Sequence, residues 1–310
     1  DPGNLLALEH LGYCRYHMNQ PREAEKAYRR LLELDPKRAS AHVSLGAALE
    51  KLGERKTARA HFQQAQELDP TYPKAYLRMG YAMLEGGDGE GARGQFQKAV
   101  ELEPESVEAR KGLARAYRLM GNLIEATAAY EELTVESADA EVLAELAEIR
   151  LLQGKPENAR EALQQALDLD PRQWKALYVR SMILTQSGDE VAARKDLERV
   201  VQLRPHFTRA HHDLGVIYAR QDDEARAIAA YQRALELEPN ALSHNGLGTV
   251  YARAGKWRAA VEQFGKAIKL DVNYRTAYQN LAQAYEAMGR PEQADAVLKR
   301  LEEIRDRTSR

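Results

Sequence analysis

The sequence predicts an all-α fold in which helix–turn–helix units are stacked in a row. Similar phrases, such as "LLELDP" ending at Pro36 and "LELEP" ending at Pro239, recur along the chain, and the first three of their prolines are evenly spaced. The spacing of about 34 residues lies in the range, about 20 to 50 residues, that is typical of an array of stacked units. Ala and Leu dominate the apolar residues, while Val, Ile and Thr are sparse, which favours helix over strand.

A unit of about 34 residues divides the chain into nine repeats, of which the fourth and the seventh are one residue short. We expect a single array without internal domain boundaries over residues 5–308, followed by a polar tail at 309–310. The expected repeats are 5–38, 39–72, 73–106, 107–139, 140–173, 174–207, 208–240, 241–274 and 275–308.

Several repeat positions carry the same kind of residue in nearly every unit. Position 8 is Gly, Ala or Ser and position 20 is always Ala, so the two helices of a unit can cross closely. Position 15 is Gly in seven units and Asn19 or Asp222 in the other two, which indicates a helix end in the left-handed conformation. Position 24 is aromatic or Leu, from Tyr28 to Leu298, and is expected to fill the seam with the neighbouring hairpin. Pro near position 32 ends the second helix.

This pattern resembles the tetratricopeptide repeat, and the resemblance covers essentially the whole chain. It implies a right-handed α-α superhelical solenoid whose first helices line a concave groove and whose second helices form the outer wall. The implied function is that of a non-catalytic scaffold, similar to a bacterial tetratricopeptide repeat protein, that binds a partner protein or peptide in the groove.

The resemblance also implies which positions line the groove: 2, 5, 6, 9, 12 and 13 of each first helix. Their charges alternate along the chain from basic to acidic to basic, so we expect a partner with the complementary pattern. The alternative is that these charges only solvate the helices and that neighbouring stripes neutralise each other. The candidate groove residues are Lys74, Arg78, Tyr81, Lys111, Arg115 and Arg118, then Glu141, Glu145 and Glu148, then Lys175, Tyr178, Arg209, His212 and Arg220. Tyr81 and Tyr178 are expected to be exposed interface anchors.

Two known binding modes of this family do not fit the sequence. The chaperone-binding group holds a terminal carboxylate with Lys, Asn and Arg, but Glu9, Tyr13 and Ser44 stand at three of the required positions. The sugar-transferase group has an Asn ladder at position 6, where only Asn280 is found here. Neither mode is therefore expected.

No catalytic constellation or cofactor site is expected. "GEGARG" at residues 89–94 has the letters of a dinucleotide-binding loop, but no predicted strand precedes it, and its glycines instead predict a weakened helix. His10, Cys14 and His17 share one helix face and could bind zinc, although structural zinc sites usually draw their ligands from two segments. The favoured interpretation is a half-buried, unmetallated Cys14. His206, His211 and His212 are interpreted as a mixture of surface and core residues.

Composition excludes several classes of partner. The net charge is −2 with 30% charged residues, so no general field for nucleic acid is present. No apolar run is long enough to insert into a membrane, and the single cysteine is compatible with cytoplasm or periplasm. The alternative function is that of a docking or regulatory region of a larger enzyme or of a bacterial secretion or exopolysaccharide export machine.

The two ends of the chain differ. "DPGN" at residues 1–4 matches "DPKR" at 35–38, so these residues are expected to be the tail of a preceding repeat. Leu6, Leu8 and Tyr13 are then expected to face the place of that neighbour, and this end could self-associate. At the other end, "RDRTSR" is expected to extend the last helix.

Overall fold

In the computed structural model, residues 4–136 and 138–308 are described, and in these ranges the chain forms α-helices and no strands. None of these helices is both long enough and apolar enough to cross a bilayer. The first helices of the nine repeats are α1 (Leu5–His17), α3 (Ala39–Lys51), α5 (Pro73–Glu85), α7 (Val107–Leu119), α9 (Ala140–Leu152), α11 (Trp174–Gln186), α13 (Thr208–Arg220), α15 (Ala241–Arg253) and α17 (Arg275–Ala287). The second helices are α2 (Pro21–Leu34), α4 (Arg55–Leu68), α6 (Gly89–Leu102), α8 (Leu123–Glu136), α10 (Pro156–Leu169), α12 (Glu190–Leu203), α14 (Glu224–Leu237), α16 (Trp257–Leu270) and α18 (Pro291–Thr308).

The helices follow the predicted repeat closely, which confirms the all-α prediction. All the first helices have the same length, as do all the second helices except the last. The last helix, α18, is longer than the others and has 18 residues, so the expected extension is confirmed as far as Thr308. Residues 1–3 and 309–310, for which a preceding repeat and a polar tail were expected, lie outside the described residues.

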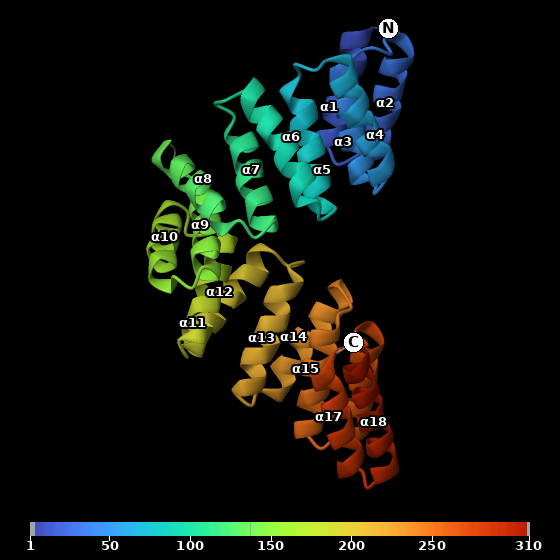
Figure 1. Ribbon diagram of the computed structural model, residues 1–310, viewed down its shortest axis with the longest axis vertical. Coiled ribbons are helices and arrows are strands. Elements are labelled where there is room, and N and C mark those ends of the chain that lie inside the picture. The colour runs from blue at the N-terminus through green and yellow to red at the C-terminus, as the bar shows by residue number, and fades with distance from the viewer. Residues whose placement is uncertain (1–3, 137, 309–310) are drawn as a thin grey trace. The chain divides into compact units, whose positions relative to one another are not determined.

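The chain divides into two compact units, and the boundary lies inside α10. The N-terminal unit comprises residues 1–162 and the C-terminal unit residues 163–310. In the N-terminal unit each helix from α1 to α8 packs against the next, and first helices also pack against one another, as α1 does on α3 and α3 on α5 (Figure 1). The same holds in the C-terminal unit, where α13 packs on α15 and α15 on α17. The single array of nine repeats stays a prediction.

The turn inside each repeat has the predicted left-handed residue. Gly53, for example, has φ of 82°, and the same sign of φ occurs at the corresponding position of all the other repeats, including Asn19 and Asp222. The amide of Glu54, the residue after Gly53, donates to the Leu49 carbonyl at 2.9 Å, which satisfies a helix-end acceptor. Position 15 therefore reverses the chain in every repeat.

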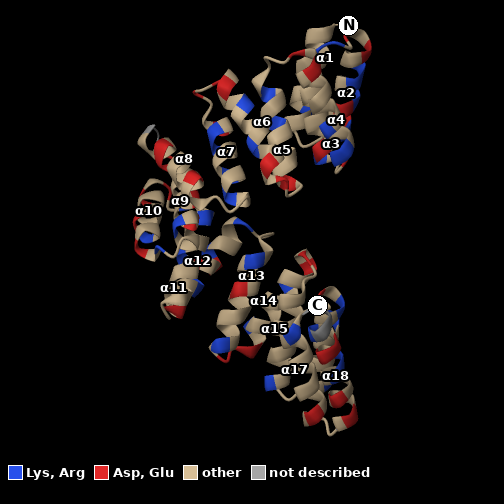
Figure 2. Ribbon diagram, viewed as in Figure 1, with Lys and Arg blue, Asp and Glu red and all other residues tan. Residues whose placement is uncertain are grey.

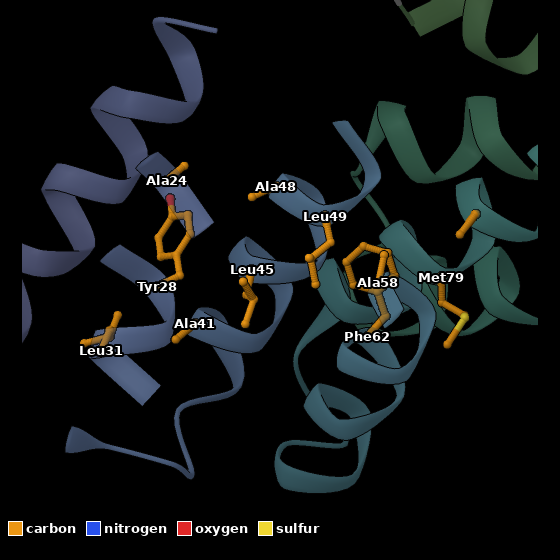
Figure 3. Close-up of a cluster of buried hydrophobic side chains, with 11 residues drawn as sticks. Ala24, Tyr28, Leu31, Ala41, Leu45, Ala48, Leu49, Ala58, Phe62 and Met79 are labelled. Carbon is orange, nitrogen blue, oxygen red and sulfur yellow. The ribbon is translucent and has the colours of Figure 1, made fainter. Parts of the chain in front are cut away.

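The core consists of repeated contacts between a large and a small residue. Tyr28 and Phe62, at position 24, are buried, and the nine alanines at position 20 are at most 1% exposed (Figure 3). A Cβ placed on Gly12, at position 8, would lie only 2.5 Å from the Tyr28 ring, and one on Gly248 would lie 2.6 Å from Phe264. The small residue at position 8 is therefore required by the ring at position 24 of the same repeat, a contact that the sequence pattern did not reveal.

The ring at position 24 also touches the next repeat, as predicted. A Cβ on Gly246 of α15 would lie 2.6 Å from the Tyr231 ring of α14, and Gly112 of α7 stands in the same relation to Phe96 of α6. The ring thus packs between the first helix of its own repeat and the first helix of the following repeat. Its size sets the distance between these two helices.

The exposed apolar surface of α1 agrees only in part with the prediction. Leu6 is 60% and Tyr13 59% exposed, and Leu11 and Met18 are exposed beside them. Leu8 is different, because it is half-buried and packs against the cluster that contains Tyr28. The expectation that Leu8 faces outward is therefore wrong.

The "GEGARG" segment lies at the start of α6, which Asp88 caps by accepting a hydrogen bond from the Gly91 amide at 2.9 Å. The element before it is α5, a helix. It thus lacks the strand that a dinucleotide-binding loop requires.

We predict that filling two open helix positions stabilises the chain. A Cβ on Gly94 of α6 or on Gly265 of α16 would meet no atom within 4 Å. Gly94→Ala and Gly265→Ala should each raise the free energy of unfolding by about 1 kcal/mol, because Ala is the better helix former. Urea denaturation measures this. Gly80→Ala is the matched control, since its Cβ would lie 2.8 Å from Phe96 and should lower stability. Equal effects at Gly80 and Gly94 would contradict the packing argument.

Candidate functional site

Both α7 and α9 carry charged residues (Figure 2). Ion pairs link the two helices across the junction between the fourth and fifth repeats. Arg115 holds Glu145 with two nitrogens, Nη2 to Oε1 at 2.7 Å and Nε to Oε2 at 3.0 Å. Three ion pairs form what we name the charge ladder: Lys111 with Glu141, Arg115 with Glu145, and Arg118 with Glu148. In each pair the two partners are 30 residues apart in the sequence.

The central step of the charge ladder is the most buried. Glu145 is 3% exposed, and the hydroxyl of Tyr130, on α8, donates a hydrogen bond to its Oε2. Burial and the neighbouring Glu145 charge raise the pKa of the Tyr130 hydroxyl, so it stays protonated and donates. Arg115 also reaches Glu141 at 3.1 Å and so links two steps of the ladder. A buried carboxylate with these partners is held in one position.

The charge ladder bears on the predicted partner-binding residues. The six ladder residues, and also Arg220 with Glu190, have an ionic partner inside the chain. This is the arrangement of the alternative interpretation, in which neighbouring stripes neutralise each other. Lys74 and Arg78 of α5 differ: neither makes a hydrogen bond or ion pair with any described residue. Lys74 is exposed and Arg78 is half-buried. Among the described residues these two cations therefore have no directly paired counterion, although the charge of Arg78 acts on Glu50.

Lys74 and Arg78 border a pocket of about 320 Å³ in the N-terminal unit. The pocket lies among first helices α1, α3 and α5, and aromatic rings make up much of its wall. Tyr13 and His17 of α1 stack with centroids 4.2 Å apart, and Lys51 of α3 lies 3.9 Å from the centre of the Tyr16 ring. The pocket thus combines rings with positive charge, and its cations outnumber its one carboxylate. Its lining residues include Tyr13, Tyr16, His17, Tyr28, Tyr72, Lys74, Arg78 and Glu108.

Neither tyrosine predicted as an exposed anchor is fully exposed. Tyr81 is half-buried, packs edge-on against Phe96 with centroids 5.1 Å apart, and donates its hydroxyl to the Glu108 carbonyl at 3.3 Å. Burial raises the pKa of Tyr81 to about 12. Tyr178 is also half-buried and packs edge-on against Phe207 at 4.8 Å. The expectation that these two rings are freely exposed is therefore wrong, and their role in partner binding stays a prediction.

The predicted residues of the C-terminal unit have mixed surroundings. Arg209 is exposed and has no ion pair with a described residue, whereas Arg220 pairs with Glu190 at 3.1 Å. His212 is half-buried; its Nδ1 lies 3.0 Å from the Ser243 hydroxyl, and burial lowers its pKa. Lys175 is half-buried on α11. His212 and Arg220 line a pocket of about 280 Å³ with Tyr231, Asn245 and Arg253.

The structure does not assemble a metal centre from the histidines that the sequence singled out. His10, Cys14 and His17 are all exposed on α1, so the expectation of a half-buried Cys14 is wrong, and His17 stacks on Tyr13. His211 bonds to the Pro205 carbonyl at 3.0 Å. Across residues 4–136 and 138–308, no three His, Cys, Asp or Glu side chains are placed to hold a metal ion together.

Breaking the charge ladder should destabilise the chain in proportion to burial. Glu145→Ala leaves Arg115 and the Tyr130 hydroxyl without their buried acceptor, so we expect a loss of about 3–5 kcal/mol in the free energy of unfolding. Glu141 is the matched control, because its side chain is 46% exposed; Glu141→Ala should cost less than about 1 kcal/mol. Urea denaturation of both variants measures the difference. Similar losses of stability in the two variants would show that burial does not determine how much each ion pair of the ladder contributes.

Glu50 of α3 should make stability depend on pH. Burial, and next the neighbouring Glu85, raise its pKa from 4.5 to about 7, while Arg78 opposes the shift. Between pH 4.5 and about 7 the folded chain holds a proton that the unfolded chain has lost, so stability falls as the pH rises through this window. Glu50→Gln should therefore add about 1 kcal/mol of stability at pH 8, a value reduced for solvent screening, and almost nothing at pH 4.

The measurement for Glu50 is the unfolding free energy of both proteins at these two pH values. A difference that is the same at pH 4 and pH 8 would contradict the assignment, because glutamine propensity and packing do not change with pH.

Comparison with known proteins identifies the repeat. Family models described as tetratricopeptide repeat match residues 7–73 and 145–206, 83–149, 208–241 and 241–307. No curated protein matches the sequence.

Among solved structures, the APC/C hetero-tetramer Cut9–Hcn1 is similar with a TM-score of 0.69 and 19% identity over 85% of this chain. This chain spans 52% of that one, so about half its length. Human IFIT1, solved as a dimer with PPP-AAAA, gives a TM-score of 0.64 and 18% identity, covering 96% of this chain and 82% of its own. MamA gives 0.50 and 26% identity, covering 53% of this chain and 96% of its own. At these identities, Cut9–Hcn1 and IFIT1 show the fold alone. Since the matched segments run with few gaps from residue 7 to residue 307, the chain belongs to the tetratricopeptide repeat family.

Proposed function

We propose that the chain binds an acidic segment of a partner protein on the first-helix face of its N-terminal unit, formed by α1, α3 and α5. The tetratricopeptide repeat architecture itself indicates a protein–protein interaction scaffold. The observation that supports the finer proposal is that Lys74 and Arg78, which make no hydrogen bond or ion pair with a described residue, lie beside a pocket lined by tyrosines.

Charge supports an acidic ligand. In the charge ladder, Lys111, Arg115 and Arg118 are already neutralised by carboxylates, so they contribute little field to a ligand. Lys74 and Arg78 stand one turn apart on the same helix, which suits two carboxylates that are close together in a bound segment. Arg209 is a corresponding candidate in the C-terminal unit, together with Lys175, Tyr178 and His212.

The rings support a segment with an aromatic or aliphatic residue next to its acidic ones. Tyr13 is 59% exposed at the pocket, and the large, rigid area of a tyrosine is typical of interface anchors. Ionic contacts at a partly exposed site mainly raise the association rate and fix the orientation of the ligand. The rings then supply the apolar burial that ionic contacts lack.

The test uses a fluorescent peptide of alternating pairs of glutamate and single leucines, with its lysine counterpart as the negative probe. Fluorescence anisotropy should show salt-sensitive binding of the acidic peptide only. Changing Lys74 and Arg78 together to Ala should weaken it about tenfold and flatten its salt dependence. The matched control changes Lys37 and Lys56 to Ala, since both are exposed and neither borders this pocket. Equal losses in the two double variants would reduce the proposal to non-specific charge attraction.

A further inference from the structure

Two histidines of the second repeat face each other outside the proposed binding face. His42 lies on α3 at repeat position 4, and His61 lies on α4 at position 23. Their Nδ1 atoms are 3.0 Å apart, and the ring planes are inclined by 32°. His42 is 9% exposed, and His61 is half-buried.

A backbone carbonyl fixes the tautomer of His42. Its Nε2 lies 3.1 Å from the Pro36 oxygen, which can only accept, so Nε2 carries the hydrogen and Nδ1 presents a lone pair. The same bond recurs at position 4 of other repeats, from the Tyr76 hydroxyl to Pro70 and from His211 to Pro205. A carbonyl that holds the far nitrogen of a histidine in this way is the usual outer contact of a metal-ligating imidazole.

His61 can supply a second lone pair. Without a metal, its Nδ1–H donates to Nδ1 of His42; when the proton lies on Nε2 instead, both Nδ1 atoms present lone pairs to the space between them. The change of tautomer releases no net proton.

We propose that His42 and His61 bind one Ni²⁺ or Cu²⁺ ion through their Nδ1 atoms. With metal–nitrogen bonds of about 2.05 Å, a nitrogen separation of 3.0 Å gives an angle of about 94° at the metal. That angle suits two neighbouring positions of a square-planar or tetragonal site, the geometry of Cu²⁺ and Ni²⁺, whereas a tetrahedral Zn²⁺ needs about 3.3 Å.

The surroundings leave room for water as the other ligands. A pocket of about 360 Å³ opens beside both rings and is bordered by Arg29, Glu33 and Pro36. Arg29 is held by Glu25 at 2.7 Å, and Glu33 by Arg30 at 2.6 Å, so the two charges next to the pocket are each compensated. The ion thus meets two protein nitrogens, no unbalanced positive charge, and space for water.

The eighth repeat provides a natural control for the pair. There His244, at position 4, places Nδ1 2.8 Å from Oε1 of Gln263, at position 23. The fold therefore accepts glutamine opposite histidine at this place. His61→Gln should keep the structure and remove one nitrogen ligand.

The experiment is calorimetric titration of the full chain with Ni²⁺ at pH 7.5 in a Cys14→Ser background, which removes the exposed thiol. We expect one ion per chain, an affinity at least about tenfold weaker for His61→Gln, and a rise in Tm with Ni²⁺ that this variant loses. Changing His10 and His17 of α1 to Gln should leave binding intact. Circular dichroism and Tm without metal verify that His61→Gln is folded. The proposal is overturned if the Cys14→Ser chain binds no Ni²⁺, or if His61→Gln binds it as tightly.

Discussion

The packing of a large side chain at position 24, a ring in six of the nine repeats, over a small residue at position 8 organises the repeats. The side chain at position 24 lies against position 8 of the same repeat so closely that a methyl group at Gly12 would overlap Tyr28. Because the ring also contacts the first helix of the following repeat, it fixes two distances at once. Consecutive first helices therefore meet in nearly the same register. A given position on one first helix lies beside the same partner position of the next first helix at each such junction.

The charge ladder is a consequence of that register. Position 9 of the fourth repeat lies beside position 6 of the fifth, so Arg115 meets Glu145. At the preceding junction the same two places hold Tyr81 and Gly112, and the absence of a side chain at Gly112 admits the Phe96 ring. One location is thus filled by a ring in one repeat and by an ion pair in the next. Each charge of the Arg115–Glu145 pair requires the other, because removing one would leave its partner unpaired at a largely buried site.

The repeated positions made most of the fold predictable from the sequence. Helix bounds, the left-handed turn at Gly53 and the burial of Ala24 depend on residue types that recur at fixed places, so each repeat supports the assignment of the others. The surface formed by the first helices was less predictable, because its contacts join residues of different repeats. Opposite charges at neighbouring positions of consecutive repeats were visible, but whether Arg115 turns to Glu145 or to solvent depends on how closely α7 approaches α9. The prediction that Tyr81 is exposed was wrong for a related reason: its ring packs on Phe96, and its hydroxyl donates to the Glu108 carbonyl of the following repeat.

Repeats that share a backbone act as natural substitutions of one another. Comparing them distinguishes residues that the fold requires from residues that could serve ligand binding. A feature required by the fold should occur wherever the backbone recurs, as Ala at position 20 does. The unpaired Lys74 and Arg78 beside tyrosines, and the facing His42 and His61, each occur in a single repeat or junction among the described residues. His244 opposite Gln263 shows that packing at positions 4 and 23 is satisfied without a second imidazole. Packing at these two positions therefore does not require the second imidazole that His61 provides.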